Sequence, residues 1–207
     1  MRALVAFAAA VAVFHHLPSI VGSAGDWVDL ATPFAVVGLA AVVLARLGAW
    51  GVALGLGIVA AIAYVDGHGI HLAANSIRAE DLTGEAESVA YFWDERFSHV
   101  EWHIGLIGLL LAFCLAEPWV RHPVRGSALQ ASLVAVLLGF TLFTSTVEGQ
   151  TWWLLPPAAT VLVVWALARP RPVLGACAGA LALAALLVAG WAAWHHGVPE
   201  FSDLGWI

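Results

Sequence analysis

Long runs without a charged residue recur along the chain, and most of them have the length of a membrane span. Five such runs cover residues 3–25, 47–65, 126–147, 149–168 and 173–199. About 20 apolar residues in a helix cross the hydrocarbon core of a bilayer. Two further runs, 30–45 and 104–116, are shorter and reach that length only by including their polar neighbours. The pattern therefore predicts seven membrane-spanning helices.

The composition is typical of a membrane protein. Hydrophobic residues make up 62% of the 207 residues and charged residues only 11%, whereas soluble domains are roughly half apolar and a quarter charged. We therefore predict an all-α integral membrane protein, one domain over residues 1–207 built as a bundle of seven transmembrane helices. The predicted spans are approximately 3–20, 27–45, 47–72, 91–120, 126–147, 151–168 and 173–196.

The arginines between the spans predict the orientation of the bundle. Short loops rich in Lys or Arg stay on the cytoplasmic side. Every second connection carries them, at Arg2, Arg46, Arg121 with Arg125, and Arg169 with Arg171. We expect the N-terminus in the cytoplasm, the C-terminus outside, and the cell membrane as the location of this multi-pass protein.

The first span also has the features of a cleavable signal peptide. Arg2 is followed by a short apolar core and then by the small residues Gly22, Ser23 and Ala24, which resemble a cleavage site. Cleavage would leave six helices and would not change the side that the rest of the chain faces.

Histidines gather at one end of the predicted bundle. Eight of the nine fall at the outer ends of spans, and only His122 belongs to an inner loop. The outer group is His15, His16, His68, His71, His99, His103, His195 and His196. Ionisable groups at membrane depth are costly and normally face the interior of a bundle or a water-filled cavity. The common level of these histidines therefore predicts a site facing the extracytoplasmic side.

The stretch FWDERFSHVEWHIG, residues 92–105, carries the densest group of candidates. Glu95, His99 and His103 are spaced i, i+4, i+8 and share one helix face. On the preceding span His68 and His71 are spaced i, i+3, and we expect the glycines at 67 and 69 to loosen that helix end. Paired imidazoles one turn apart can hold a metal ion. The predicted metal ligands are His68, His71, His99 and His103.

The carboxylates beside these histidines predict catalysis. A catalytic zinc takes three protein ligands, keeps a water in its fourth position and needs a nearby base. Glu95 and Asp94 are the candidate bases, and Ser98 is a candidate for orienting substrate or stabilising charge. We therefore expect a metal-dependent hydrolase, with zinc favoured over iron, that acts on a lipid or amphipathic substrate at the outer leaflet.

Several alternatives stay open at this point. Histidine pairs at helix ends are also typical of interfacial residues bonded to loop acids. Adjacent residues point about 100° apart, so at most one of His15 and His16, and one of His195 and His196, can face a common centre. A di-iron oxidase or hydroxylase is a second reading, since HGIH and HVEWH are similar to the histidine boxes of membrane desaturases. The HxxHH box is absent, and desaturase sites face the cytosol.

Non-catalytic binding of a metal ion or haem is a third reading. Seven-helix membrane hydrolases with three zinc-binding histidines are the nearest analogy by class, but their last-helix histidine pair with three intervening residues is absent here. The analogy transfers no residue roles. With no lysine and no basic patch in the chain, nucleic acid is not expected as a partner.

Overall fold

The computed structural model describes residues 1–21, 24–78, 83–120 and 124–206, and in these ranges the protein is helical with no strand. Its seven longer helices are α1 (Arg2–His16), α2 (Gly25–Arg46), α3 (Gly51–Arg78), α5 (His99–Ala116), α6 (Ala128–Glu148), α7 (Leu155–Ala168) and α8 (Pro172–His195). The short elements are α4 (Glu85–Tyr91), η2 (Phe92–Ser98), η3 (Glu117–Trp119) and η4 (Trp152–Leu154). The all-α class is confirmed.

Five of the described helical segments are long and apolar enough to cross a membrane, judged by length and composition. They are Gly25–Arg46, Gly51–Arg78, Glu85–Trp119, Ala128–Glu148 and Pro172–His195. The third of these joins α4, η2, α5 and η3 into one rod of 35 residues. Two shorter apolar helices, Arg2–His16 and Trp152–Ala168, complete the set.

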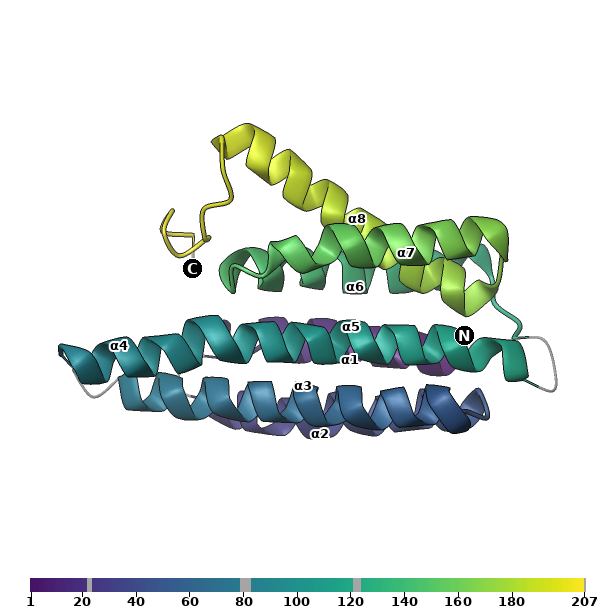
Figure 1. The fold of residues 1–207 in the computed structure, drawn as a ribbon, viewed down its shortest axis with the longest axis horizontal. Coiled ribbons are helices and arrows are strands. Elements are labelled where there is room, and N and C mark those ends of the chain that lie inside the picture. The colour runs from purple at the N-terminus through teal and green to yellow at the C-terminus, as the bar shows by residue number, and fades with distance from the viewer. Residues whose placement is uncertain (22–23, 79–82, 121–123, 207) are drawn as a thin grey trace.

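The helices form two groups that lie side by side (Figure 1). One group contains α1, α2, α3 and α5, and the other contains α6, α7 and α8, with the C-terminal end of α8 leaning away from the bundle. The most extensive contacts join α3 to α5 and α6 to α8, while α1 packs against both α2 and α6. At the centre Phe7 of α1 meets Phe113 of α5 edge to face, with ring centroids 5.1 Å apart. The two chain ends lie at opposite ends of the bundle.

Helices α3 and α5 approach each other with their backbones in contact. A Cβ atom on Gly67 would lie 2.6 Å from the backbone nitrogen of Trp102, and one on Gly105 would lie 2.4 Å from that of Tyr64. Only glycine fits at such distances. The expectation that the glycines at 67 and 69 loosen the end of α3 is wrong, because the helix continues unbroken to Arg78. The glycine at 67 serves close packing instead.

Some helix ends differ from the predicted spans. Helix α1 ends at His16, because Pro18 has no N–H with which to continue the hydrogen-bond pattern of the helix. Helix α3 continues past residue 72 to Arg78, and the fourth span already begins at Glu85. These extensions contain polar residues, because a helix can continue beyond the apolar run that marks a membrane span. Gly22 and Ser23, part of the predicted cleavage pattern, lie outside the described residues.

An acid at the end of the bundle opposite the histidines fixes the start of the last helix. Glu117 is 4% exposed, and its two oxygens accept hydrogen bonds of 2.9 Å from the backbone nitrogens of Val173 and Leu174. These N–H groups in the first turn of α8 have no partner within the helix, and a negative charge there is favourable. The end of α5 and the start of α8 are thereby tied together.

Candidate functional site

The four predicted ligand histidines lie next to one another where α3 faces α5. The ring centroids of His68 and His71 are 6.5 Å apart. The centroid of His71 is 4.9 Å from that of His99, which in turn is 6.2 Å from that of His103. Exposure falls with depth, since His71 is partly exposed while His103 is fully buried. The close backbone contact at Gly67 and Gly105 places the two pairs at this distance.

A tryptophan lies among the four rings. The indole of Trp102 has centroid distances of 4.9 Å to His68, 5.3 Å to His103, 5.9 Å to His99 and 6.1 Å to His71. It stacks on His103 with an interplanar angle of 7°. With the side chains in these positions, no group of three or more His, Cys, Asp or Glu in the described ranges is arranged to hold a metal ion.

The two histidines nearest η2 each have one ring nitrogen close to an oxygen acceptor. Nδ1 of His71 lies 2.8 Å from Oδ1 of Asp94, at ion-pair distance. Nδ1 of His99 lies 3.2 Å from the backbone carbonyl oxygen of Glu95. A carbonyl oxygen only accepts hydrogen bonds, so Nδ1 of His99 carries the proton. In the neutral ring Nε2 then bears the free lone pair.

The two buried histidines follow the same rule. Nε2 of His68 donates to the carbonyl oxygen of Asp29 at 2.8 Å, which leaves the lone pair on Nδ1. Nδ1 of His103 lies 2.8 Å from the hydroxyl oxygen of Thr151. The second nitrogen of each ring, Nδ1 of His68 and Nε2 of His103, is buried and has no hydrogen-bond partner among the described residues.

One ring nitrogen near a protein partner and the other left over is the arrangement found in metal-binding histidines. Such a residue normally donates one ring N–H to a carboxylate, a backbone carbonyl or a water, which fixes its tautomer and orientation, and uses the other nitrogen for the metal. Here Asp94, the backbone of Glu95, Thr151 and the backbone of Asp29 are the outer partners. The chemistry of the donors therefore fits a metal, although the rings stand apart around Trp102.

The three predicted catalytic residues occupy different environments. Asp94 is completely buried, and its second oxygen lies 2.7 Å from Arg78 Nη1. The same nitrogen lies 2.6 Å from Oε1 of Glu95, whose side chain remains 28% exposed. The Ser98 hydroxyl donates to the carbonyl oxygen of Asp94. Glu95 is thus the more exposed of the two carboxylates, whereas Asp94 and Ser98 are buried and bonded to other groups of the protein.

The acids and Ser98 lie on a π-helical segment, η2, that the sequence did not indicate. A π-helix has i→i+5 hydrogen bonds, is rare and occurs frequently at functional sites. Residues Phe92–Ser98 form this segment directly before α5. It lies at the outer end of the cluster, where the candidate base is found.

A connection distant in sequence completes the surroundings of the histidines. Between α6 and η4, Gly149 packs so closely on His99 that a Cβ atom there would lie 2.8 Å from the ring. Thr151 two residues later holds His103, and between them Gln150 has a positive φ of 50°. No residue type or spacing in this connection pointed to these contacts.

The C-terminal segment fastens this connection. Oε2 of Glu148 accepts hydrogen bonds from the backbone nitrogens of Phe201 at 2.8 Å and Ser202 at 3.3 Å. The Gln150 side chain donates to the carbonyl oxygen of Val198 at 3.1 Å. Burial, together with the charges of nearby acids, raises the pKa of Glu200 in the same segment. The end of the bundle that holds the histidine cluster is therefore both tied down and acidic.

The remaining histidines divide as their adjacency requires. The His15 ring lies 5.7 Å from that of Trp102 and joins the cluster, while His16 points to Thr141, 3.5 Å from its hydroxyl. His195 packs on Trp191 with ring centroids 4.1 Å apart. His196, with a positive φ of 56°, ends α8 at the surface. His122 and Arg121 of the inner loop lie outside the described residues.

Comparison with known proteins adds no relative to this picture. No protein-family model, no curated protein and no solved structure matches the chain. A functional assignment therefore has to come from the geometry of the histidine cluster and from its position in the bundle.

Proposed function

We propose that this protein is an integral-membrane, metal-dependent hydrolase that acts on a lipid or another amphipathic molecule at the outer leaflet of the cell membrane. One observation carries the proposal. Two of the four neighbouring histidines, His68 and His103, each have one nitrogen bonded to a carbonyl or hydroxyl group and a second, buried nitrogen with no hydrogen-bond partner among the described residues. Buried polar atoms without partners are rare in folded proteins.

The ligand set follows from which nitrogens are free. His103 would bind through Nε2 and His68 through Nδ1, the nitrogens without a partner among the described residues. His71 and His99 would bind through Nε2, because their Nδ1 atoms lie near Asp94 and the Glu95 carbonyl. Imidazole nitrogens with oriented outer partners suit zinc, which remains our preferred metal over iron. Because the indole of Trp102 lies among the rings, metal binding is coupled to rotation of these side chains.

The carboxylates would divide the remaining work. A catalytic zinc polarises a bound water and lowers its pKa toward about 7. Glu95, partly exposed beside His99, is the candidate base that takes a proton from water. Asp94 orients His71 and is itself held by Arg78. The Ser98 hydroxyl donates a hydrogen bond to the backbone of the π-helical segment, so its role in positioning substrate would be indirect.

The proposed topology has seven spans, with the N-terminus in the cytoplasm and the cluster near the extracytoplasmic surface. Five helices of spanning length support it, together with two shorter apolar ones. The arginines of alternate connections also support it, because cytoplasmic loops retain positive charge. A substrate carrying hydrocarbon chains could then reach the site laterally from the outer leaflet.

Metal analysis of purified protein tests the proposal. Protein extracted from membranes in mild detergent should contain about one zinc ion per chain, measured by inductively coupled plasma mass spectrometry. The double variant His99→Ala, His103→Ala should lose it. His196→Ala is the matched control, since that histidine lies at the surface end of α8, and it should keep the metal. Glu95→Gln should keep the metal and lose hydrolysis of a fluorogenic lipid ester.

Other outcomes distinguish the alternatives. Iron in place of zinc, with an oxygen-dependent absorption change, would replace the hydrolase with an oxidase or hydroxylase. A strong visible absorption band would indicate haem. Metal-free wild-type protein that stays metal-free after incubation with zinc would refute the proposal and leave the histidines as packing partners of Trp102.

A further inference from the structure

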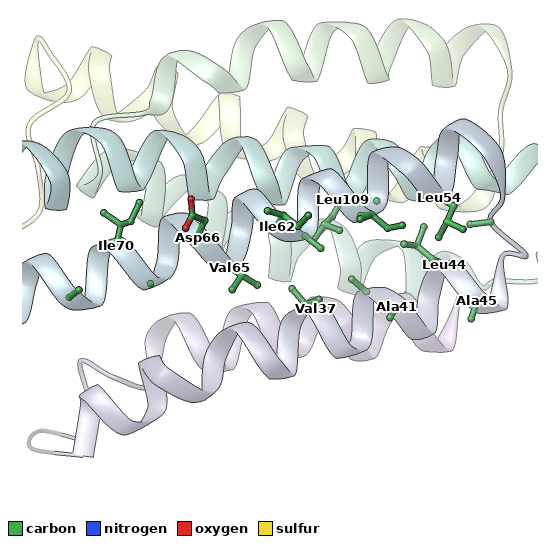
Figure 2. A pocket seen from close by; sticks show the side chains of 17 residues that line it. Val37, Ala41, Leu44, Ala45, Leu54, Ile62, Val65, Asp66, Ile70 and Leu109 are labelled. Carbon is green, nitrogen blue, oxygen red and sulfur yellow. The ribbon is translucent and has the colours of Figure 1, made fainter.

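An apolar groove runs along the membrane-facing side of α2 and α3, away from the histidines. It has a volume of about 1040 Å³, and of its 17 lining residues only Asp66 is polar. Figure 2 shows Val37 from α2 and Val65 from α3 pointing into the same space, with the red oxygens of Asp66 among side chains of carbon alone. Asp66 and His68 lie about 200° apart around α3, so the groove is separate from the histidine cluster.

A second acid lies beside Asp66. Glu101 on α5 lies close to Asp66, because the residues that follow them, Trp102 and Gly67, are in backbone contact. Oε2 of Glu101 is buried without a hydrogen-bond partner among the described residues, and neither acid belongs to an ion pair there. Ionisable groups at membrane depth normally pair with an opposite charge. The groove therefore offers the carboxylate of Asp66, with Glu101 beside it, and neither acid has a cationic partner among the described residues.

We propose that this groove binds a single-chain lipid amine, with its ammonium group between Asp66 and Glu101 and its hydrocarbon chain along α3 toward Leu54. An ammonium carries three donors and no acceptor, so it can serve both carboxylates, including the unpaired oxygen. From Asp66 to Leu54 the helix rises about 18 Å. This stretch of the groove is longer than the roughly 15 Å of hydrocarbon in one leaflet, so it has room for a lipid chain.

Depth distinguishes this ligand from an ordinary phospholipid. The Asp66 carboxylate projects into the apolar part of α3, with Ile70 and Ala73 one and two turns nearer the outer end in the same groove. Ile70 and Ala73 also line a second hollow of about 880 Å³ beneath α4, which gives a path from the outer surface. The ammonium of phosphatidylethanolamine lies above its phosphate and thus above this depth. An amine attached directly to the chain reaches it.

Native mass spectrometry of the full chain released from dodecyl maltoside micelles tests the proposal. Hexadecylamine, hexadecanol, palmitic acid and phosphatidylethanolamine are added separately at equal concentration. We expect one hexadecylamine per chain, bound at least about tenfold more tightly than the other three probes, a difference equivalent to about 1.4 kcal/mol. Asp66→Asn should abolish this preference for the amine, while hexadecylamine and hexadecanol should both still bind weakly.

Three further variants separate the groove from its charge. Ile62→Trp should reduce amine and alcohol binding together, because Ile62 lines the groove. Val59→Trp, an exposed position of α3 that does not line it, and Glu87→Gln, an exposed acid of α4, are the matched controls and should bind like the wild type. Metal content, read in the same spectra, reports on the histidine site independently.

Three results would overturn the proposal. They are equal binding of amine and alcohol, no adduct with any single-chain probe, and amine binding that survives Asp66→Asn unchanged. A dimer that binds no probe would also overturn it, since a second copy of the chain would then cover the groove.

Discussion

The hydroxyl oxygen of Thr151 lies 2.8 Å from Nδ1 of His103, and the two residues are 48 positions apart in the sequence. Both are buried, with exposures of 1% and 0%. The contact joins the connection after α6 to the deepest histidine of the cluster. It fixes the orientation of that ring and directs Nε2 toward space with no hydrogen-bond partner among the described residues.

Replacing Thr151 tests whether this contact positions a metal ligand. Thr151→Val keeps the shape and removes the hydroxyl group, and we expect zinc affinity to fall about 10- to 100-fold, as for other outer partners of metal-binding histidines. Thr151→Ser restores the hydroxyl and should return affinity to near the wild-type value. Competition with a chromophoric chelator measures the affinity. Equal affinities in Val and Ser variants would reduce Thr151 to a packing residue.

The buried carboxylate of Asp94 should contribute to stability. Asp94→Asn removes the charge that faces both His71 and Arg78. We expect a loss of about 1.5–3 kcal/mol, the range for hydrogen bonds to charged groups, tempered because Arg78 is 32% exposed and can turn to water. Thermal unfolding in detergent measures it. Glu87→Gln, at an exposed position, should change stability by less than about 0.5 kcal/mol, and an equal effect of both changes would contradict the prediction.

The contact between α3 and α5 should tolerate no added methyl group. Gly105→Ala places a carbon 2.4 Å from the backbone nitrogen of Tyr64, and overpacking of this kind typically costs about 1–3 kcal/mol. Gly190→Ala in α8 meets nothing within 4 Å and should be neutral or slightly stabilising, because alanine favours helix more than glycine does. Thermal unfolding of the two variants in the same detergent compares them. Similar melting temperatures would show that the helices separate easily.

Cysteine labelling tests the orientation. Cys114 and Cys177 are both fully buried, so a single introduced cysteine should give the signal. Ser202→Cys, near the C-terminus, should react with a membrane-impermeant maleimide in intact cells. Ala128→Cys, at the start of α6, should react only after the membrane is opened. The reverse pattern would invert the proposed topology and move the histidine cluster to the cytoplasmic side.

The sequence predicted the helices well because a bilayer requires long uncharged runs, and such runs are visible without any knowledge of packing. It located the histidine pairs for a similar reason, since spacings of three and four residues define one face of a helix. Helix ends were harder to place. Pro18 shortened α1, while polar residues extended α3 to Arg78.

What the sequence could not predict depends on contacts between distant segments. The position of Trp102 among the rings, the backbone carbonyl of Asp29 beside His68 and the hydroxyl of Thr151 beside His103 all arise from packing of different helices. No local signal marks them. The roles of the four histidines as metal ligands, and of Glu95 as a base, stay predictions.

The contacts of Glu148 and Gln150 with the C-terminal segment have a practical consequence. Trp191 near the end of α8 also donates to the carbonyl oxygen of Pro199 at 3.0 Å. The segment after α8 therefore holds the connection after α6 in place at this end of the bundle. Trimming the chain after His196 would release the loop that carries Thr151 without touching a single histidine. Loss of this short C-terminal segment would then change the position of His103, so the segment indirectly determines the geometry of the histidine cluster.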